Sequence, residues 1–92
     1  MVHFLVHGTT DNVAVAVVEI TKGETCRCLN LTSREKSAIE AAEDIPLGHK
    51  IALRDLEVNG SVIKYDRDIG RVTASIKRGE HVHVHNLKSR RW

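Results

Sequence analysis

The stretch Ile76-Lys77-Arg78-Gly79-Glu80-His81-Val82-His83-Val84-His85-Asn86 joins a turn pattern to an alternating row of histidine and valine. A glycine three positions after an apolar residue suits a turn, because glycine adopts a positive φ without steric cost. The alternation has the two-residue period of a strand, and it predicts three imidazoles on one face and two valines on the other. The stretch therefore predicts a turn that leads into a β-strand.

The same turn pattern, Ile-x-x-Gly, occurs twice more in the chain and ends there at Gly23 and at Gly48. The three glycines are too irregularly spaced for a solenoid, so we interpret the pattern as a local turn between strands. Short apolar runs around these turns predict further strands. The predicted strands span residues 3–7, 13–20, 26–29, 50–53, 61–64, 69–75 and 81–85. Many short strands with glycine turns predict a mainly β domain, either barrel-like or built of folded hairpins.

Segment 31–42 departs from this strand-rich pattern. It combines helix-forming residues with a cap at Thr32 or Ser33, so we expect one short helix or a turn there. The only proline, Pro46, lies inside a predicted turn, where its missing N–H group does no harm.

Composition predicts a single folded domain that covers residues 1–92. Hydrophobic residues make up 41% of the chain and charged residues 28%, which is ordinary for a folded protein. Only 3% are aromatic and the formal net charge is +2, and both values argue against a nucleic-acid partner. The basic residues Lys88, Arg90 and Arg91 form a short tail on a body that is close to neutral.

The two cysteines, Cys26 and Cys28, are neighbours on one face of a predicted strand. This spacing does not suit a disulfide, so we expect two free, buried thiols that act as small hydrophobic side chains. The apolar runs are short and interrupted by charged residues, which predicts no signal peptide, no membrane span and a cytoplasmic location.

The histidine row is the strongest chemical feature of the sequence. Same-face neighbours on a strand are about 6.6 Å apart at the backbone, so two of the imidazoles can converge on one metal ion or one anionic ligand. The alternative is a solvated histidine face with the valines packed beneath it. Asn86 ends the row with an amide, and Gly48-His49-Lys50 adds an imidazole and an ammonium after a turn of the same type. If the turns lie together, these groups will lie together too.

Several segments carry a family likeness. They are Asp44-Ile45-Pro46-Leu47-Gly48-His49-Lys50-Ile51-Ala52-Leu53, then Val62-Ile63-Lys64-Tyr65, Ile69-Gly70 and the opening stretch 76–86. Together they resemble the small N-terminal SAF-type domain of altronate and galactarate dehydratases, and the related small subunit of sulfolactate sulfo-lyase. The resemblance implies a β-clip fold. The chain departs from the family pattern at Asp66, where glycine is common, and in segment 31–42.

The resemblance also implies a division of labour. A module of this kind is expected to pack against a large catalytic lyase subunit and to complete its active site for a sugar acid or another hydroxy acid. A divalent metal of the iron or manganese type is expected in that complex. The resemblance implies His83 and His85 as metal ligands, and His49, Lys50 and Asn86 as substrate-binding residues, with no catalytic residue assigned.

Three functions follow as hypotheses. The first is the small subunit of a two-component sugar-acid hydro-lyase of the altronate or galactarate dehydratase type. The second is the same scaffold in a sulfolactate sulfo-lyase, which releases sulfite instead of water. The third is a stand-alone module that binds sugar acids or a protein without catalysis. In each case, the edges of many short strands could also be covered by self-association.

Overall fold

The computed structural model describes residues 1–89, which form nine short strands and contain no helical segment. Arg90 and Arg91 of the predicted basic tail lie outside the described residues. The strands are β1 (Phe4–Val6), β2 (Val13–Ala16), β3 (Thr25–Asn30), β4 (Lys36–Glu40), β5 (Lys50–Ala52), β6 (Ser61–Lys64), β7 (Arg67–Val72), β8 (His81–Val82) and β9 (Leu87–Lys88). Each of the seven predicted strands overlaps one of these, so the predicted mainly β fold is confirmed. Residues 1–89 contain no helix that is long and apolar enough to cross a membrane.

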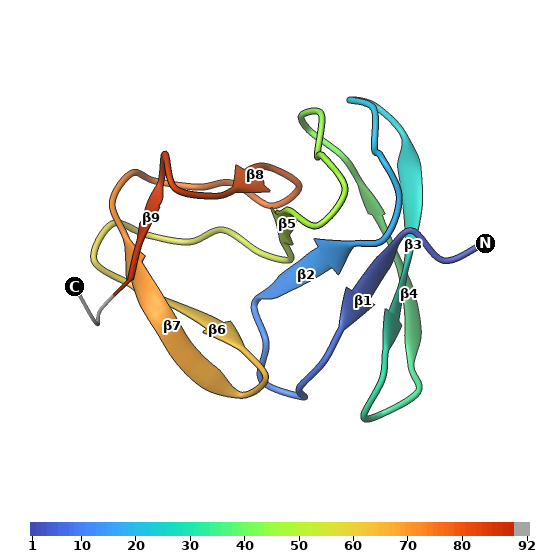
Figure 1. Ribbon diagram of the computed structural model, residues 1–92, viewed down its shortest axis with the longest axis horizontal. Helices are drawn as coiled ribbons and strands as arrows, with labels where there is room; N and C mark the ends of the chain where they lie inside the picture. Colours follow the sequence, from blue (N-terminus) through green and yellow to red (C-terminus); the bar gives the residue numbers. More distant parts are fainter. Residues whose placement is uncertain (90–92) are drawn as a thin grey trace.

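Two curled sheets make up the fold. The larger sheet has the order β4-β3-β1-β2-β5-β8, and the smaller has the order β6-β7-β9. Neighbouring strands are antiparallel except β1 and β3, which are parallel. In Figure 1, β1, β3 and β4 form one side of the molecule and β6, β7 and β9 the other, with β2 and β5 between them.

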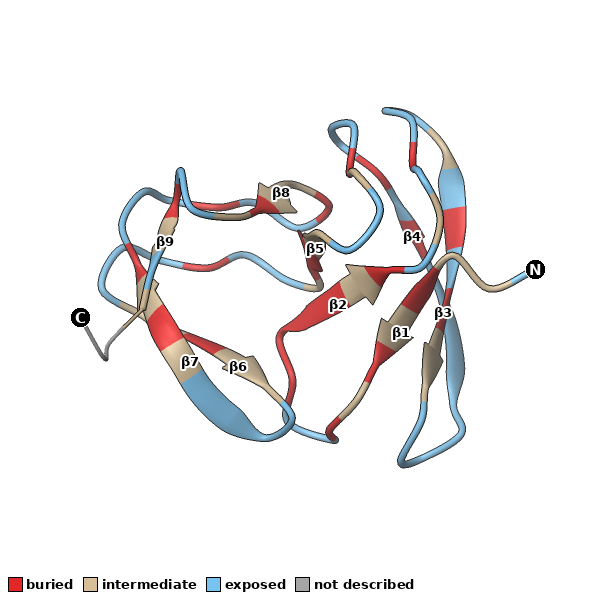
Figure 2. Cartoon of the chain, viewed as in Figure 1, coloured by how far each residue is buried: buried red, intermediate tan, exposed pale blue. Residues whose placement is uncertain are grey.

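The central strands β2 and β5 contribute side chains to both of the two small hydrophobic cores. Val13 pairs with Ala52 and belongs to the core of the smaller sheet, whereas the next pair, Ala14 and Ile51, belongs to the core of the larger sheet. Successive side chains of a strand point to opposite faces, so two adjacent strands can supply both cores. The buried residues along β2 are visible in the middle of Figure 2.

The turn pattern read from the sequence is confirmed in its conformation. The glycines have positive φ values of 89° at Gly23, 85° at Gly48 and 89° at Gly79. A fourth copy of the turn follows Leu56, where Asn59 takes the glycine position with φ 72°. The sequence pattern missed this copy because asparagine replaces glycine, although asparagine is the residue that best tolerates this conformation after glycine.

These four turns associate in pairs through their apolar anchors. Ile20 and Ile45 exchange two backbone hydrogen bonds of 3.0 Å each, and Leu56 and Ile76 exchange two of 2.7 and 2.9 Å. Each anchor residue therefore forms an antiparallel bridge with the anchor of another turn. The two bridges set the position of each turn relative to its partner, and with it the start of the following strand.

Of the two expectations for segment 31–42, the turn is confirmed and the short helix is not found, and strand β4 follows the turn. The Asn30 side-chain oxygen accepts the N–H groups of Thr32 and Ser33, and Arg34 adopts φ 66°, which together close a tight turn. Strand β4 then pairs along β3, and Ile39 is buried opposite Cys26. Pairing and burial of Ile39 override the local helix preference of this segment.

Cys26 and Cys28 are free and buried in β3, as predicted. Burial, together with the nearby Glu24 carboxylate, raises the pKa of the Cys26 thiol to about 11 from its ordinary 9.0, and burial also raises the pKa of Cys28. Since the thiolate is the reactive form, both thiols should be inert in the folded protein.

We therefore expect a thiol reagent such as Ellman's reagent to leave the native chain unmodified at about pH 8 and to modify both cysteines in denaturant. A thiol that ionises near 9.0 when unfolded and near 11 when folded also makes the free energy of unfolding fall as the pH rises through this range. Rapid modification of the native chain would contradict the burial of these two side chains.

Candidate functional site

Two of the paired turns bring histidines from distant parts of the chain together. His49 follows the turn at Gly48 and leads into β5, and His81 follows the turn at Gly79 and begins β8. Strands β5 and β8 are antiparallel neighbours, with Lys50 opposite Val82 and Ile51 opposite His81. The residues that leave the two turns therefore meet at one edge of the larger sheet.

Three imidazoles, those of His49, His81 and His83, form what we call the imidazole cluster. The His49 and His83 rings stack with centroids 3.8 Å apart, and His49 Nδ1 lies 2.7 Å from His81 Nε2. One ring nitrogen from each of the three residues lies within 4.8 Å of the others. His85 lies at the margin of the cluster, with its ring tilted against His81 at a centroid distance of 5.0 Å.

The histidine row is only partly a strand. Strand β8 ends at Val82, which is buried as predicted, and residues 83–86 form a turn. Val84 is 82% exposed, so the prediction that it packs beneath the histidines is wrong. The imidazoles gather because of the turn and the neighbouring β5, and strict alternation does not extend beyond Val82.

Asn86 explains why the strand stops. Its side-chain oxygen accepts the N–H of His83 at 3.0 Å, and its side-chain nitrogen donates to the carbonyl of His81 at 2.8 Å. Leu87 N–H also donates to the His83 carbonyl at 2.9 Å. Because Asn86 is buried and both of its polar side-chain groups bond the backbone, it holds the two histidines in place.

The surroundings of His81 and His83 favour the neutral form of these two imidazoles. Burial lowers the pKa of His81, the neighbouring imidazoles of His85, His49 and His83 lower it further, and Glu43 opposes this effect. Burial likewise lowers the pKa of His83, and His49, Lys50 and His85 add to the effect. A neutral imidazole keeps a lone pair on one ring nitrogen, which is the form that binds metals.

The predicted site residues fall into two groups. His49 and His83 lie in the cluster. The other three lie outside it: His85 is at its margin, Asn86 bonds the backbone, and Lys50 is the first residue of β5. Lys50 is half-buried, and burial together with the Lys64 ammonium lowers its pKa. The sequence prediction did not assign a role to His81, although its position directly after a turn, like that of His49, was a usable signal.

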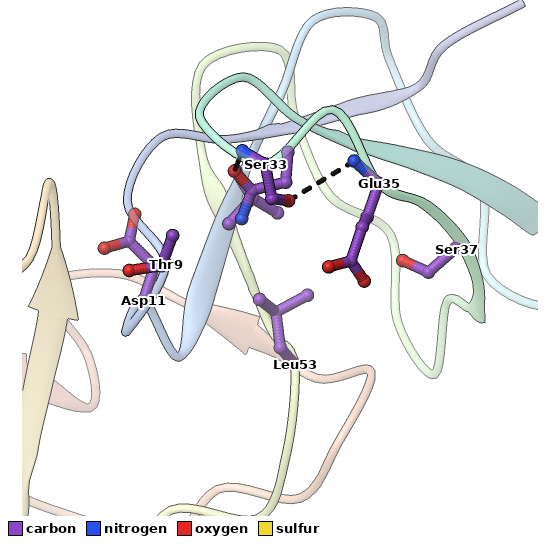
Figure 3. A pocket seen from close by; sticks show the side chains of 8 residues that line it. Thr9, Asp11, Ser33, Glu35, Ser37 and Leu53 are labelled. Atoms are coloured by element: carbon purple, nitrogen blue, oxygen red, sulfur yellow. Dashed lines mark hydrogen bonds between the residues drawn. The ribbon is translucent and has the colours of Figure 1, made fainter.

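A polar cavity of about 250 Å³ lies elsewhere, between the β1–β2 loop and the β3–β4 hairpin, and contains none of the predicted site residues. Figure 3 shows Asp11, Ser33, Glu35 and Leu53 around it. Asp11 accepts backbone N–H groups there, and Ser33 Oγ accepts the N–H of Glu35 at 3.3 Å. We interpret this cavity as a gap between structural loops.

A mainly β fold of short strands in curled sheets is consistent with a SAF-type, β-clip-like domain. The chain matches the family model described as the altronate/galactarate dehydratase SAF domain over residues 2–90, and it belongs to this family.

Characterised relatives carry this module in two contexts. The chain is 46% identical to (2R)-sulfolactate sulfo-lyase subunit alpha of Chromohalobacter salexigens over 92 residues, which cover 99% of this chain and 98% of the relative. It is 42% identical to the subunit of the same name from Paracoccus pantotrophus over 65 residues, 71% of this chain and 97% of that subunit. It is also 42% identical to altronate dehydratase of Bacillus subtilis over 79 residues, which cover 86% of this chain but 15% of that protein.

Proposed function

We propose that this chain is the small subunit of a (2R)-sulfolactate sulfo-lyase, and that it acts together with a large catalytic subunit. The observation that carries the proposal is the 46% identity to a sulfo-lyase subunit alpha along nearly the full length of both chains. The second sulfo-lyase subunit is also matched over 97% of its length. This support favours the second of the three sequence hypotheses over the first.

The chemistry of the proposed reaction fits a divided active site. A base removes the proton on the hydroxyl-bearing carbon next to the carboxylate, a carbon–carbon double bond forms, and the carbon–sulfur bond breaks with its electron pair leaving on sulfite. The resulting enol becomes a keto acid. Substrate sites are concave pockets that bury most of the ligand surface. In this proposal the small β-domain forms one side of such a pocket, and a second polypeptide supplies the remaining catalytic groups.

In this proposal the edge of the molecule that carries the imidazole cluster faces the large subunit and the substrate. Lys50 has no carboxylate partner among residues 1–89, so its ammonium is available to attract a carboxylate or sulfonate group. His49 and His85 supply further donors at the same edge. Asn86 contributes by holding the turn that carries His83 and His85.

A sugar-acid dehydratase subunit is the second candidate. It is supported by the description of the family and by the 42% identity to altronate dehydratase. Both reactions begin with loss of a proton next to a carboxylate and differ in the leaving group, which is sulfite in one and water in the other. A cytoplasmic location and self-association stay predictions in either case.

Reconstitution tests the proposal. We expect the purified chain and its large partner each to be inactive alone, and the mixture to release sulfite from (2R)-sulfolactate, as measured with a sulfite-specific dye. Keto-acid formation from altronate or galactarate without sulfite would favour the second candidate. Activity of the large partner that does not change when this chain is added would contradict both and favour a stand-alone binding module.

A further inference from the structure

The three nitrogens of the imidazole cluster come from two separate elements, the turn before β5 and the β8 region. Each of the three residues offers one ring nitrogen, and these atoms lie within 4.8 Å of one another. Four-coordinate zinc with metal–nitrogen bonds of 2.0 to 2.1 Å places its ligand nitrogens about 3.4 Å apart. The rings are nearly parallel and stacked, so to act as three ligands of one ion they would have to rotate out of the stack until their in-plane lone pairs point to one centre.

One atom of the cluster lacks the partner that a buried polar atom requires. His83 Nδ1 is the only buried side-chain nitrogen or oxygen among residues 1–89 without a hydrogen-bond partner. A buried polar group left unsatisfied destabilises the folded state. Nearly all buried polar groups in folded proteins are satisfied, so this unpartnered nitrogen supports the presence of a ligand at the site.

The backbone around the cluster is fixed before any ion arrives. Asn86 bonds the backbone of both His81 and His83, and Glu43 accepts the N–H of His81 at 3.0 Å. The contact of 2.7 Å between His49 and His81 joins the two elements directly. An ion would therefore meet three ligands whose main-chain positions are already set, which lowers the entropic cost of binding.

We propose that His49, His81 and His83 bind one divalent first-row transition metal ion in the small chain alone, with a fourth coordination position open. A set of three imidazoles suits zinc, iron, nickel or copper better than magnesium, calcium or manganese, which prefer oxygen ligands. The open position resembles that of catalytic metal sites and would accept an anionic oxygen from a substrate or a side chain of the partner. This site replaces the His83 and His85 pair that the sequence suggested.

Direct metal titration tests the site. The untagged, metal-free chain is titrated with Co²⁺, and we expect one saturable site with the visible absorption bands of tetrahedral cobalt, which Zn²⁺ then displaces. His81→Gln and His83→Gln should each weaken binding on the order of 100-fold, since loss of a ligand costs at least as much as loss of a supporting residue. His7→Gln is the matched control, because His7 stacks on Tyr65 outside the cluster and its variant should bind normally.

A second measurement on the unaltered chain keeps the proposal testable if a variant unfolds. Addition of Zn²⁺ should shift the ring nitrogen resonances of His49, His81 and His83 and leave those of His3 and His7 in place. Absence of saturable binding, or shifts confined to His83 and His85, would overturn the proposal. Sulfite release by the reconstituted enzyme is measured separately. A chain that binds no metal in the titration but supports sulfite release would refute this site and leave the proposed function intact.

Discussion

Replacement of Asp11 by alanine is expected to lower the free energy of unfolding by about 4 kcal/mol, because it leaves three backbone N–H groups without their acceptor. The buried Asp11 carboxylate accepts the N–H of Gly8 at 3.0 Å, of Tyr65 at 3.1 Å and of Asp66 at 2.8 Å. Tyr65 and Asp66 form the tip of the β6–β7 hairpin and have φ values of 56° and 59°. Asp11 thus ties the loop after β1 to a strained turn in the other sheet.

Chemical denaturation followed by circular dichroism measures this effect. Asp44→Ala is the matched control, since Asp44 is an exposed carboxylate that accepts one backbone N–H, that of Lys22. It should cost about 1 kcal/mol. Equal losses in the two variants would show that water replaces the Asp11 carboxylate at the hairpin tip.

The strands and turns could be predicted from the sequence because their signals are local. The Ile-x-x-Gly pattern predicted three positive-φ turns, and short apolar runs located seven strands. The fourth turn was missed because Asn59 stands where the pattern requires glycine. Of the helix or turn expected in segment 31–42, only the turn forms, because a long-range partner, β3, decides the structure around Ile39, and propensity contains no information about partners.

The candidate site was predictable only in part, for the same reason. The histidine row identified His81, His83 and His85 as one chemical feature, and the repeated turn suggested that His49 would join them. Which three meet depends on the pairing of β5 with β8 and on the Asn86 side chain, which ends the strand at Val82. Neither effect is visible in the spacing of residues 81–86, so the sequence did not show that His81, and not His85, lies with His49 and His83.

Gly79→Ala is expected to lower the free energy of unfolding by about 3 kcal/mol. A side chain is strained at φ 89°, and a Cβ built at Gly79 lies 2.6 Å from the carbonyl oxygen of Glu40. The backbone of Gly79 also donates to Ala52 at 2.8 Å and accepts from Ala42 at 2.8 Å, so the turn cannot move away without loss of these bonds. His81 lies two residues further on, and we expect its position to change as well.

Gly23→Ala separates the two sources of strain in this prediction. Gly23 has the same φ of 89°, but a Cβ there has no heavy atom within 4 Å. It should therefore lose only the conformational part, about 1–2 kcal/mol. Denaturation of both variants gives the difference that belongs to the Glu40 contact, and Co²⁺ titration shows whether the imidazole cluster has shifted in Gly79→Ala alone. Equal losses of stability in the two variants would mean that the Glu40 carbonyl moves away from the new methyl group. The contact between this turn and the end of β4 would then not be what positions the histidines.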